Sequence, residues 1–300
     1  MSIPQVLLRH QGLRNLIPPR VKASFAENRV RLVRVTRRSE LRNVFHCCVH
    51  KTGSQWVRKV LADPDVYRRT GLRPYAYAPR LPPERRNLRY GELRFDQPFP
   101  ARTIVSPLYL DAEGFAAIPK PGAWRAFVVI RDPRDIVVSW YFSALRSHPT
   151  LSNPSLQRTR ERLAGMSEEE GLIFAIGRLA ENGLFEALRG WWDARPEGVL
   201  LVRYEDLVGP AAEEAWARLL DHCDVALGDR ERRELLSRYS FERLSGRRPG
   251  EEDPGSKLRK GVAGDWRDRF TPAVHRAFEE TVGDLAVRLE TRVTDASGRE

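Results

Sequence analysis

Short apolar runs, each followed by a polar loop and then by a helical pattern, recur along this chain. The runs are rich in Val, Ile, Leu and Phe, which is typical of parallel strands that are buried on both faces. They occupy residues 44–49, 127–130 and 199–202. Helical periodicity follows each run, at residues 55–62, 136–145 and 211–223. Strands that alternate with helices predict an α/β fold, in which helices cover both faces of a parallel sheet.

Two loops of this pattern lie where ligands bind in such folds. Parallel α/β sheets bind their ligands at the carboxyl ends of the strands, and residues 51–56 and 131–139 are both expected there. The second loop also contains a helix start, because Asp132 is a suitable N-cap and Pro133 suits the first helical position. Asp135 adds an acid at the third helical position.

Residues 64–107 interrupt the alternation of strands and helices. Prolines are frequent in this segment, and tyrosines and arginines lie among them. Because proline lacks a backbone donor and stops helices, we expect irregular structure here, as a lid or an acceptor-binding segment. The preceding helix should end before Pro64.

The composition fits one folded domain with a large excess of basic residues. The 300 residues are 41% hydrophobic and 30% charged, which suits a packed core in water. The net charge of +11 would attract anions such as nucleic acid, acidic lipid or a phosphorylated cofactor. A dispersed, solvated Arg-rich surface explains the same charge equally well, so the charge alone assigns no partner.

The N-terminal residues 1–42 form a basic segment ahead of the predicted domain at residues 43–290. This segment could contact an anionic surface weakly, but a solvated chain end is the favoured interpretation. We find no signal-peptide pattern and no apolar stretch of membrane-spanning length. The three cysteines have neither disulfide-framework nor metal-ligand spacing: Cys47, Cys48 and Cys223. We therefore expect a cytoplasmic protein without a metal site.

The loop after the first strand is a candidate phosphate-binding loop. A loop that leaves a buried strand and enters a helix presents N–H groups and the positive end of the helix to an anion. Gly53 permits a close approach of the backbone, and Lys51 adds a cation. The hydroxyl groups of Thr52 and Ser54 can donate hydrogen bonds. The ATP-binding pattern G-x-x-x-x-G-K-[ST] is absent, and the later strands end in arginine, which disfavours magnesium-dependent phosphoryl transfer.

Two further basic clusters could bind phosphate. Arg131 follows the second strand, and Ser139 lies two turns into the next helix. A guanidinium group binds phosphate through two hydrogen bonds, although Arg131 could equally pair with Asp135 as a loop clamp. The third cluster, Arg259-Lys260-Gly261, could clasp a phosphate or form an exposed basic turn.

In this order, the motifs resemble those of the sulfotransferases that use 3′-phosphoadenylyl sulfate (PAPS). The segment from Lys51 to Trp56 resembles the 5′-phosphosulfate loop of that family, and the segment from Arg131 to Tyr141 resembles its 3′-phosphate motif. Tyr204-Glu205-Asp206 matches a recurrent segment of the family, and Ser240-Phe241 and residues 259–266 match its C-terminal signature. The resemblance spans residues 44–270 and implies a P-loop-like α/β domain with helices on both faces of the sheet.

The resemblance also implies a role for each matching residue. The 5′-phosphosulfate would be held by Lys51, Thr52, Gly53, Ser54 and Gln55, with Lys51 also at the leaving oxygen. The 3′-phosphate would be held by Arg131, Ser139, Arg259, Lys260 and Gly261. The adenine would lie between Trp56 and Phe241, with Tyr204 at its edge. PAPS would be the sulfo donor, the 3′,5′-bisphosphate PAP would be the product, and no metal would be required.

The general base and the acceptor stay open. The usual general-base histidine of the family is missing from the stretch Ile104 to Leu108, so the alternatives are His50, Asp111 and Glu113. The acceptor would be a small molecule or a glycan with a hydroxyl or an amine. We expect no specific binding of nucleic acid. A nucleotide-dependent kinase and a non-catalytic anion- or nucleic-acid-binding protein are the alternative functions, and the sequence predicts no oligomeric state.

Overall fold

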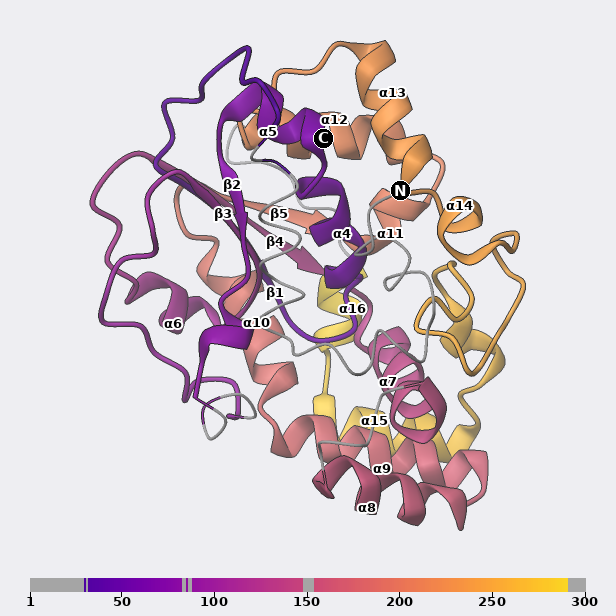
Figure 1. Ribbon diagram of the computed structural model, residues 1–300. Helices are drawn as coiled ribbons and strands as arrows, with labels where there is room; N and C mark the ends of the chain where they lie inside the picture. The colour runs from indigo at the N-terminus through magenta and orange to yellow at the C-terminus, as the bar shows by residue number, and fades with distance from the viewer. Residues whose placement is uncertain (1–29, 31, 83–84, 86–87, 148–153, 291–300) are drawn as a thin grey trace.

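The computed structural model describes residues 30, 32–82, 85, 88–147 and 154–290. Within these residues, five parallel strands form one sheet in the order β2-β3-β1-β4-β5 (Figure 1). The strands are β1 Asn43–Cys48, β2 Arg73–Tyr75, β3 Thr103–Tyr109, β4 Trp124–Ile130 and β5 Val199–Arg203. The α/β fold with a parallel sheet is confirmed, and β1, β4 and β5 are the three strands that the apolar runs predicted.

Helices connect the strands and follow β5 to the end of the described chain. They are α4 Ser54–Leu61, α5 Pro64–Thr70, α6 Ala112–Ala116, α7 Pro133–Phe142, α8 Pro154–Ala164, α9 Glu168–Glu181, α10 Leu184–Ala194, α11 Tyr204–Val208, α12 Ala212–His222, α13 Asp229–Arg238, α14 Phe241–Ser245, α15 Pro272–Val282 and α16 Leu285–Glu290. Shorter turns are η1 Ala78–Arg80, η3 Ser143–Ser147 and η4 Asp265–Asp268.

The sheet is buried on both faces because alternate side chains of each strand enter two separate cores. In β1, Phe45 and Cys47 lie in one core, and Val44 lies in the other. The first core includes side chains of α7, α9, α10 and α15, and the second includes side chains of α4, α5 and α12. Figure 1 shows α9 and α15 below the sheet and α5 and α12 above it. This pattern explains why the strands are continuous apolar runs.

The expectation of irregular structure over residues 64–107 is wrong at its N-terminal end, where α5 forms. The carboxylate of Asp63 accepts a hydrogen bond from the N–H of Asp65 at 2.8 Å and caps the helix. Pro64 then occupies the first helical position, where its missing N–H would have no partner in any case. The same proline that ends one helical pattern therefore begins the next helix.

The expectation is also wrong at the C-terminal end of the segment, where β3 continues through Pro107. The register of β1 against β3 shifts here, because Phe45 pairs with Val105 while Cys47 pairs with Leu108. One extra residue of β3 thus forms a bulge. A strand tolerates proline at a bulge, because the residue there donates no ladder hydrogen bond.

The basic segment 1–42 lies mainly outside the described residues, and its described part contacts the domain. The N–H of Arg42 donates to the carbonyl oxygen of Ala123 at 2.7 Å. Arg37 pairs with Asp224, and its Nη1 donates to the Asp224 carbonyl oxygen at 2.9 Å. The division into a segment 1–42 and one domain at 43–290 stays a prediction.

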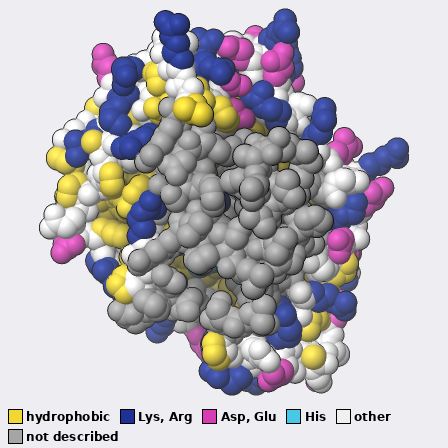
Figure 2. Space-filling view, in the orientation of Figure 1, with side chains coloured by type: hydrophobic (Ala, Val, Ile, Leu, Met, Phe, Trp, Pro, Cys, Tyr) yellow, Lys and Arg dark blue, Asp and Glu magenta, His cyan; other side chains and the backbone are white. Residues whose placement is uncertain are grey.

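Basic side chains are distributed widely on the molecular surface. On the face shown in Figure 2, Lys and Arg side chains lie around the rim with Asp and Glu side chains among them. Ion pairs such as Arg69 with Glu231 and Arg238 with Asp65 join separate helices. None of the helices in the described ranges has both the length and the apolar character needed to cross a bilayer.

Candidate active site

The loops that follow β1 and β4 meet at one edge of the sheet. The two strands are neighbours in register, with Cys48 opposite Val129, so the residues after them leave the sheet side by side. The Nη1 atom of Arg131 donates a hydrogen bond to the carbonyl oxygen of Lys51 at 3.0 Å. The structure therefore brings together the two loops that the sequence marked as phosphate-binding.

The β1 loop turns sharply into α4. Lys51 and Gly53 both have left-handed backbones, with φ of 70° and 76°. A β-carbon at Gly53 would lie 2.8 Å from the ring of Tyr204, so this close approach requires glycine. Gly53 precedes α4 and provides no side-chain cap. Because the first N–H groups of a helix lack partners within the helix, this helix start can bind an anion.

The polar side chains of the β1 loop already make contacts within the protein. The buried Thr52 donates its hydroxyl proton to the carbonyl oxygen of Val49 at 2.9 Å. Ser54 and Gln55 bond to the hydroxyl of Tyr109 at 2.8 and 3.2 Å. Thr52 would therefore reach a ligand through its N–H, whereas its hydroxyl supports the loop.

Arg131 pairs with Asp135, which is one of the two roles that the sequence left open. Its side chain is only 9% exposed, its Nη2 lies 3.4 Å from Asp135 Oδ2, and its guanidinium covers the Tyr204 ring at 4.4 Å. Its Nε is buried and has no hydrogen-bond partner among the described residues. A buried donor without a partner costs about 1–3 kcal/mol. An anionic oxygen at this site would satisfy it.

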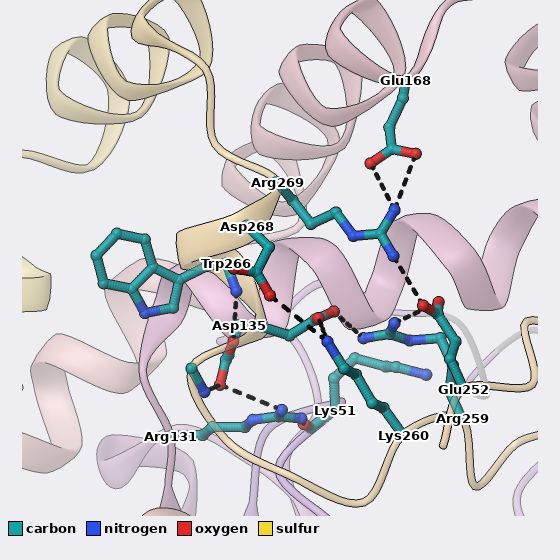
Figure 3. Close-up of polar contacts among 12 residues, drawn as sticks. Lys51, Arg131, Asp135, Glu168, Glu252, Arg259, Lys260, Trp266, Asp268 and Arg269 are labelled. Carbon is teal, nitrogen blue, oxygen red and sulfur yellow. Dashed lines mark hydrogen bonds and ion pairs between the residues drawn. The ribbon is translucent and has the colours of Figure 1, made fainter. Parts of the chain in front are cut away.

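Asp135 joins the start of α7 to the third basic cluster (Figure 3). Its side chain is fully buried, and it accepts hydrogen bonds from the N–H groups of Gly264 at 2.7 Å and Trp266 at 3.1 Å. It therefore holds the segment around 264 beside Arg131. The N–H of the N-cap Asp132 donates instead to Glu205 Oε1 at 2.9 Å. Asp135, the acid at the third helical position, therefore does not form a capping box with Asp132.

Asp265 holds the two cations of the third cluster. It is 3% exposed, and its carboxylate pairs with Arg259 and with Lys260. Burial alone would raise the pKa of Asp265, but hydrogen bonds from Lys260 and Arg259 lower it below its usual value. Arg259 also pairs with Glu252 at 2.7 Å. Both cations are thus positioned by neighbouring acids, of which Figure 3 labels Glu252 next to Arg259 and Asp268 next to Lys260.

Excess positive charge surrounds Lys51. Burial and the charges of Arg131, Lys257 and Arg259 lower the pKa of Lys51 to about 7. A nearby anion would favour the charged form of a lysine and keep its pKa near the ordinary value of about 10.4. The lowered pKa of Lys51 therefore indicates an excess of positive charge around it. The electrostatics therefore favour an anionic ligand at the end of β1.

The predicted adenine-binding aromatics are fixed by neighbouring segments. Trp56 Nε1 donates to the carbonyl oxygen of Tyr239 at 2.7 Å, just ahead of α14. A β-carbon at Gly261 would enter the ring of Phe241, so that ring lies against the Gly261 backbone. Tyr204 meets Trp56 edge-on at 6.4 Å. Trp56 and Phe241 make no ring contact with each other in the described ranges.

Ser139 and His50 lie on different sides of the β1 loop. Ser139 is half-buried on α7, in the turns that follow Arg131. His50 lies toward β3, where its ring stacks on Tyr109 at 4.3 Å and its Nδ1 is 2.6 Å from the hydroxyl of Tyr90. Arg131 and Ser139 thus lie on the segment that follows β4, whereas the predicted base lies beside the end of β3.

The two carboxylate alternatives to His50 have structural partners. Asp111 is the N-cap of α6 and accepts a hydrogen bond from the N–H of Gly114 at 2.9 Å. Arg94 lies 3.5 Å from Asp111 and 3.7 Å from the exposed Glu113. Within the described part of the chain, His, Cys, Asp and Glu form no group of three that could hold a metal ion.

Sequence reasoning missed several residues of this region. Asp265 was noticed only as part of a motif, and Tyr109 was not noticed at all. Tyr90 was assigned to an irregular segment, and Lys257 was passed over although its charge acts on Lys51. Tyr109 ends β3, a strand that the apolar pattern did not predict, so its position gave no signal. Tyr90 reaches the site through an irregular chain segment, for which no local pattern exists.

We expect Asp265→Asn to destabilise the free protein more than its complex with PAP. Without the carboxylate, Arg259 and Lys260 lose their common counter-charge, and hydrogen bonds to charged groups are each worth about 1.5–3 kcal/mol. A bound phosphate would restore the missing negative charge. Thermal unfolding with and without PAP measures both states. Asp268→Asn is the control, since this side chain is 75% exposed and 3.7 Å from Lys260; equal losses with and without PAP would contradict the assignment.

The parallel sheet, the sharp loop between β1 and α4 and the basic loop after β4 define an α/β protein with a P-loop-like fold. A family model described as "Sulfotransferase domain" matches residues 122–290. The chain belongs to the sulfotransferase domain family.

Curated relatives agree with this family. Sulfotransferase 2A6 of Mus musculus is 29% identical over 172 residues, which are 54% of this chain and 56% of that protein. The 3-alpha-hydroxysteroid sulfotransferase of Cavia porcellus is 28% identical over 52% of this chain and 54% of its own length. The matches thus span little more than half the length of these relatives.

Solved structures show the same fold. Mouse sulfotransferase SULT7A1, crystallised as a complex with PAP, aligns with a TM-score of 0.53 and 18% identity over 83% of this chain and 85% of its own. Retinol dehydratase in complex with androsterone and PAP aligns with a TM-score of 0.51 and 17% identity over 84% and 82%. At these identities the likeness concerns the fold.

Proposed function

We propose that this protein is a sulfotransferase that moves the sulfo group of PAPS to a hydroxyl or amine of an acceptor. The observation that carries the proposal is the direct contact between the Lys51 and Arg131 loops. One loop presents a helix start and a lysine, and the other presents a buried guanidinium with an unsatisfied Nε. A nucleotide with phosphates on two different carbons can span both.

The residues present fit PAPS. Lys51 and the N–H groups of the β1 loop would hold the 5′-phosphosulfate, and Arg131 with Ser139 would hold the 3′-phosphate. Arg259, Lys260 and Gly261 would close on the same phosphate, and Trp56, Phe241 and Tyr204 would contact the adenine. The orphaned Nε of Arg131 and the depressed pKa of Lys51 are the features that an anion would correct.

The chemistry follows from where charge develops. In an in-line, loose transition state, negative charge builds on the oxygen that leaves the sulfur. A preorganised cation and N–H donors near that oxygen lower the barrier electrostatically. Lys51 and the start of α4 occupy this position in the proposed arrangement. The relatives and the PAP complexes of similar fold support this assignment.

The acceptor is proposed to bind on the β3 side of the β1 loop. A cavity of about 130 Å³ lies there, and its wall combines aromatic and apolar residues such as Tyr77, Leu81 and Tyr109 with His50, Arg85 and Arg89. Such a wall suits a compact acceptor group, such as a phenol or a short alcohol, carried by a small molecule or a glycan. A cytoplasmic location is also proposed, and the three buried free thiols support it.

Binding of PAP tests the proposal. PAP at a hundredfold excess over its Kd should stabilise the protein by about 2.7 kcal/mol, which raises the Tm by several degrees. AMP, which lacks the 3′-phosphate, should shift the Tm much less. No shift with PAP would overturn the proposal, and a shift with ATP and Mg²⁺ alone would favour the kinase. Transfer of radiolabelled sulfo groups to phenols, sugars, lipids and peptides would then identify the acceptor class.

Proton uptake should accompany PAP binding. The pKa of Lys51 is about 7 in the free protein, and a bound phosphate should raise it toward the ordinary value of about 10.4. Between these two values the complex binds more protons than the free protein, so affinity should be highest below about pH 7 and fall as the pH rises. Calorimetry at about pH 8 in Tris and in HEPES measures the uptake. Lys51→Ala should abolish it; uptake that persists in this variant would assign the proton elsewhere.

A further inference from the structure

We propose that Tyr90 is a positioning residue that holds His50 in the orientation and tautomer of a general base. This inference rests on the proposed sulfotransferase function and deepens it. The family's usual histidine is absent from the matching stretch of β3, where Ser106 and Pro107 stand. His50 follows β1, the strand that pairs with β3, and could replace the missing histidine.

Tyr90 binds His50 at two points through one oxygen. The backbone N–H of His50 donates to Tyr90 Oη at 2.8 Å, and Nδ1 of the same residue lies 2.6 Å from Oη. Two contacts from one residue to one atom fix the rotation of the imidazole about its side-chain bonds. The ring of Tyr109 stacks beneath it at 4.3 Å with the planes 8° apart. The orientation of the imidazole is therefore defined by two tyrosines.

Tyr109 connects this histidine to the donor loop. Its hydroxyl bonds to Ser54 Oγ at 2.8 Å and to Gln55 Nε2 at 3.2 Å, at the start of α4. Its backbone N–H donates to the hydroxyl of Tyr77 at 3.1 Å. The same residue thus contacts the loop proposed to hold the phosphosulfate and the ring proposed to take the acceptor proton. Reacting groups need this kind of shared, rigid support.

Tyr90 is itself anchored. Its N–H donates to the carbonyl oxygen of Asn182 at 3.0 Å, between α9 and α10. Gly183 lies against its backbone, since a β-carbon there would come within 3.3 Å of the Tyr90 carbonyl oxygen. Burial raises the pKa of Tyr90 well above its ordinary value, so the phenol stays protonated. A fixed, neutral phenol can accept a hydrogen bond from Nδ1–H.

The proton accounting requires this tautomer. When Nδ1 carries its proton and donates to Tyr90, Nε2 is the ring nitrogen that can accept the acceptor's proton. In the transfer, a bond forms between the acceptor oxygen and sulfur, and the bond from sulfur to the 5′-phosphate oxygen breaks. The electron pair goes to that phosphate oxygen, near Lys51, and the acceptor proton goes to His50. The resulting imidazolium still donates from Nδ1 to Tyr90, which stabilises it.

Other charged groups act on the same ring. Among the described residues, the titratable and charged groups around His50 and its cavity include Cys48, Lys51, Arg58, Tyr77, Arg85, Arg89, Tyr90 and Tyr109. The cations disfavour the imidazolium, whereas the hydrogen bond to Tyr90 supports it. Removing this bond should therefore lower the pKa of His50.

Nitrogen NMR of the full chain tests the proposal without an acceptor. With ¹⁵N-histidine labelling and His50→Gln for assignment, we expect the Nδ1–H tautomer at His50 in the wild type. Tyr90→Phe should lose this preference and lower the pKa of His50 by about one unit, the value of a hydrogen bond to a charged group. An Nε2–H tautomer in the wild type, or an unchanged tautomer and pKa in Tyr90→Phe, would overturn the proposal.

A kinetic experiment separates this inference from the proposed function. With labelled PAPS and 2-naphthol as the probe acceptor, Tyr90→Phe should lower kcat at least about tenfold and leave the Tm shift by PAP unchanged. The double variant with His50→Gln should lose no more than His50→Gln alone. Tyr67→Phe on α5 is the matched hydroxyl control. A chain that fails to bind PAP contradicts the sulfotransferase, whereas PAP binding with an undisturbed His50 in Tyr90→Phe contradicts only the role of Tyr90.

Discussion

Replacement of Lys51 by alanine should lower the kcat of sulfo transfer about 10²–10³-fold, as loss of one preorganised electrostatic donor does elsewhere. Lys51 lies at the end of β1, beside the start of α4 and in the field of Arg131, Lys257 and Arg259. These neighbours continue to attract the phosphates when Lys51 is missing. The Kd for PAP should therefore rise by less than the factor by which kcat falls. Single-turnover kinetics with labelled PAPS, together with PAP titration, measure the two effects separately.

Lys59→Ala is the matched control for Lys51. Lys59 is an exposed lysine in the last turn of α4, so its removal changes the net charge equally but away from the helix start. It should leave kcat within about twofold, because surface substitutions have small effects. If Lys51→Ala weakened PAP binding and kcat by the same factor, Lys51 would bind the nucleotide uniformly and would not act at the leaving oxygen.

Replacement of Arg131 by alanine should remove most of the stabilisation by PAP. Charge-assisted hydrogen bonds from a guanidinium to phosphate are among the strongest in proteins, and Nε of Arg131 has no other partner in the described residues. A hundredfold increase in Kd would reduce the stabilisation from about 2.7 to about 0.4 kcal/mol at the same PAP concentration. Thermal unfolding across a PAP titration measures this loss.

Arg131 is buried, so a milder variant keeps the test valid if alanine disturbs folding. Arg131→Lys retains the charge but loses Nε and the two-pronged geometry, and it should still weaken PAP binding about tenfold or more. Arg134→Lys is its control. Arg134 lies three residues after Arg131, in the first turn of α7, but it pairs with Asp132 and Glu290 and covers the Trp266 ring at 3.6 Å. A full response to PAP in Arg131→Lys would place the 3′-phosphate elsewhere.

The fold was accessible from the sequence because its strands are buried on both faces. Alternate side chains of β1, β4 and β5 enter two different cores, so most residues of these strands are apolar. Such continuous apolar runs can be recognised in the sequence alone. β3 escaped because Pro107 resembles a strand breaker, and only the bulge opposite Phe45 and Cys47 makes it acceptable. β2 has three residues, Arg73–Tyr75, and too little pattern to be detected.

The candidate site was accessible to the extent that its residues lie directly after strands. Lys51 and Arg131 follow β1 and β4, and neighbouring parallel strands deliver their ends to one place. The supports behind these residues were not accessible. Asp135 reaches Gly264 across 129 positions, and Tyr90 reaches His50 from a segment without regular structure. Such contacts depend on how loops pack, which no local pattern records.

The left-handed backbone of Lys51 has an evolutionary consequence. Residues other than glycine hold such a conformation at a cost of about 1–3 kcal/mol, so the local chain would be most relaxed with glycine at position 51. Glycine, however, would remove the cation that is expected to contact the anion there. Selection for stability therefore favours glycine at position 51, whereas selection for catalysis favours lysine. In a descendant that had lost its activity, we expect glycine to replace Lys51.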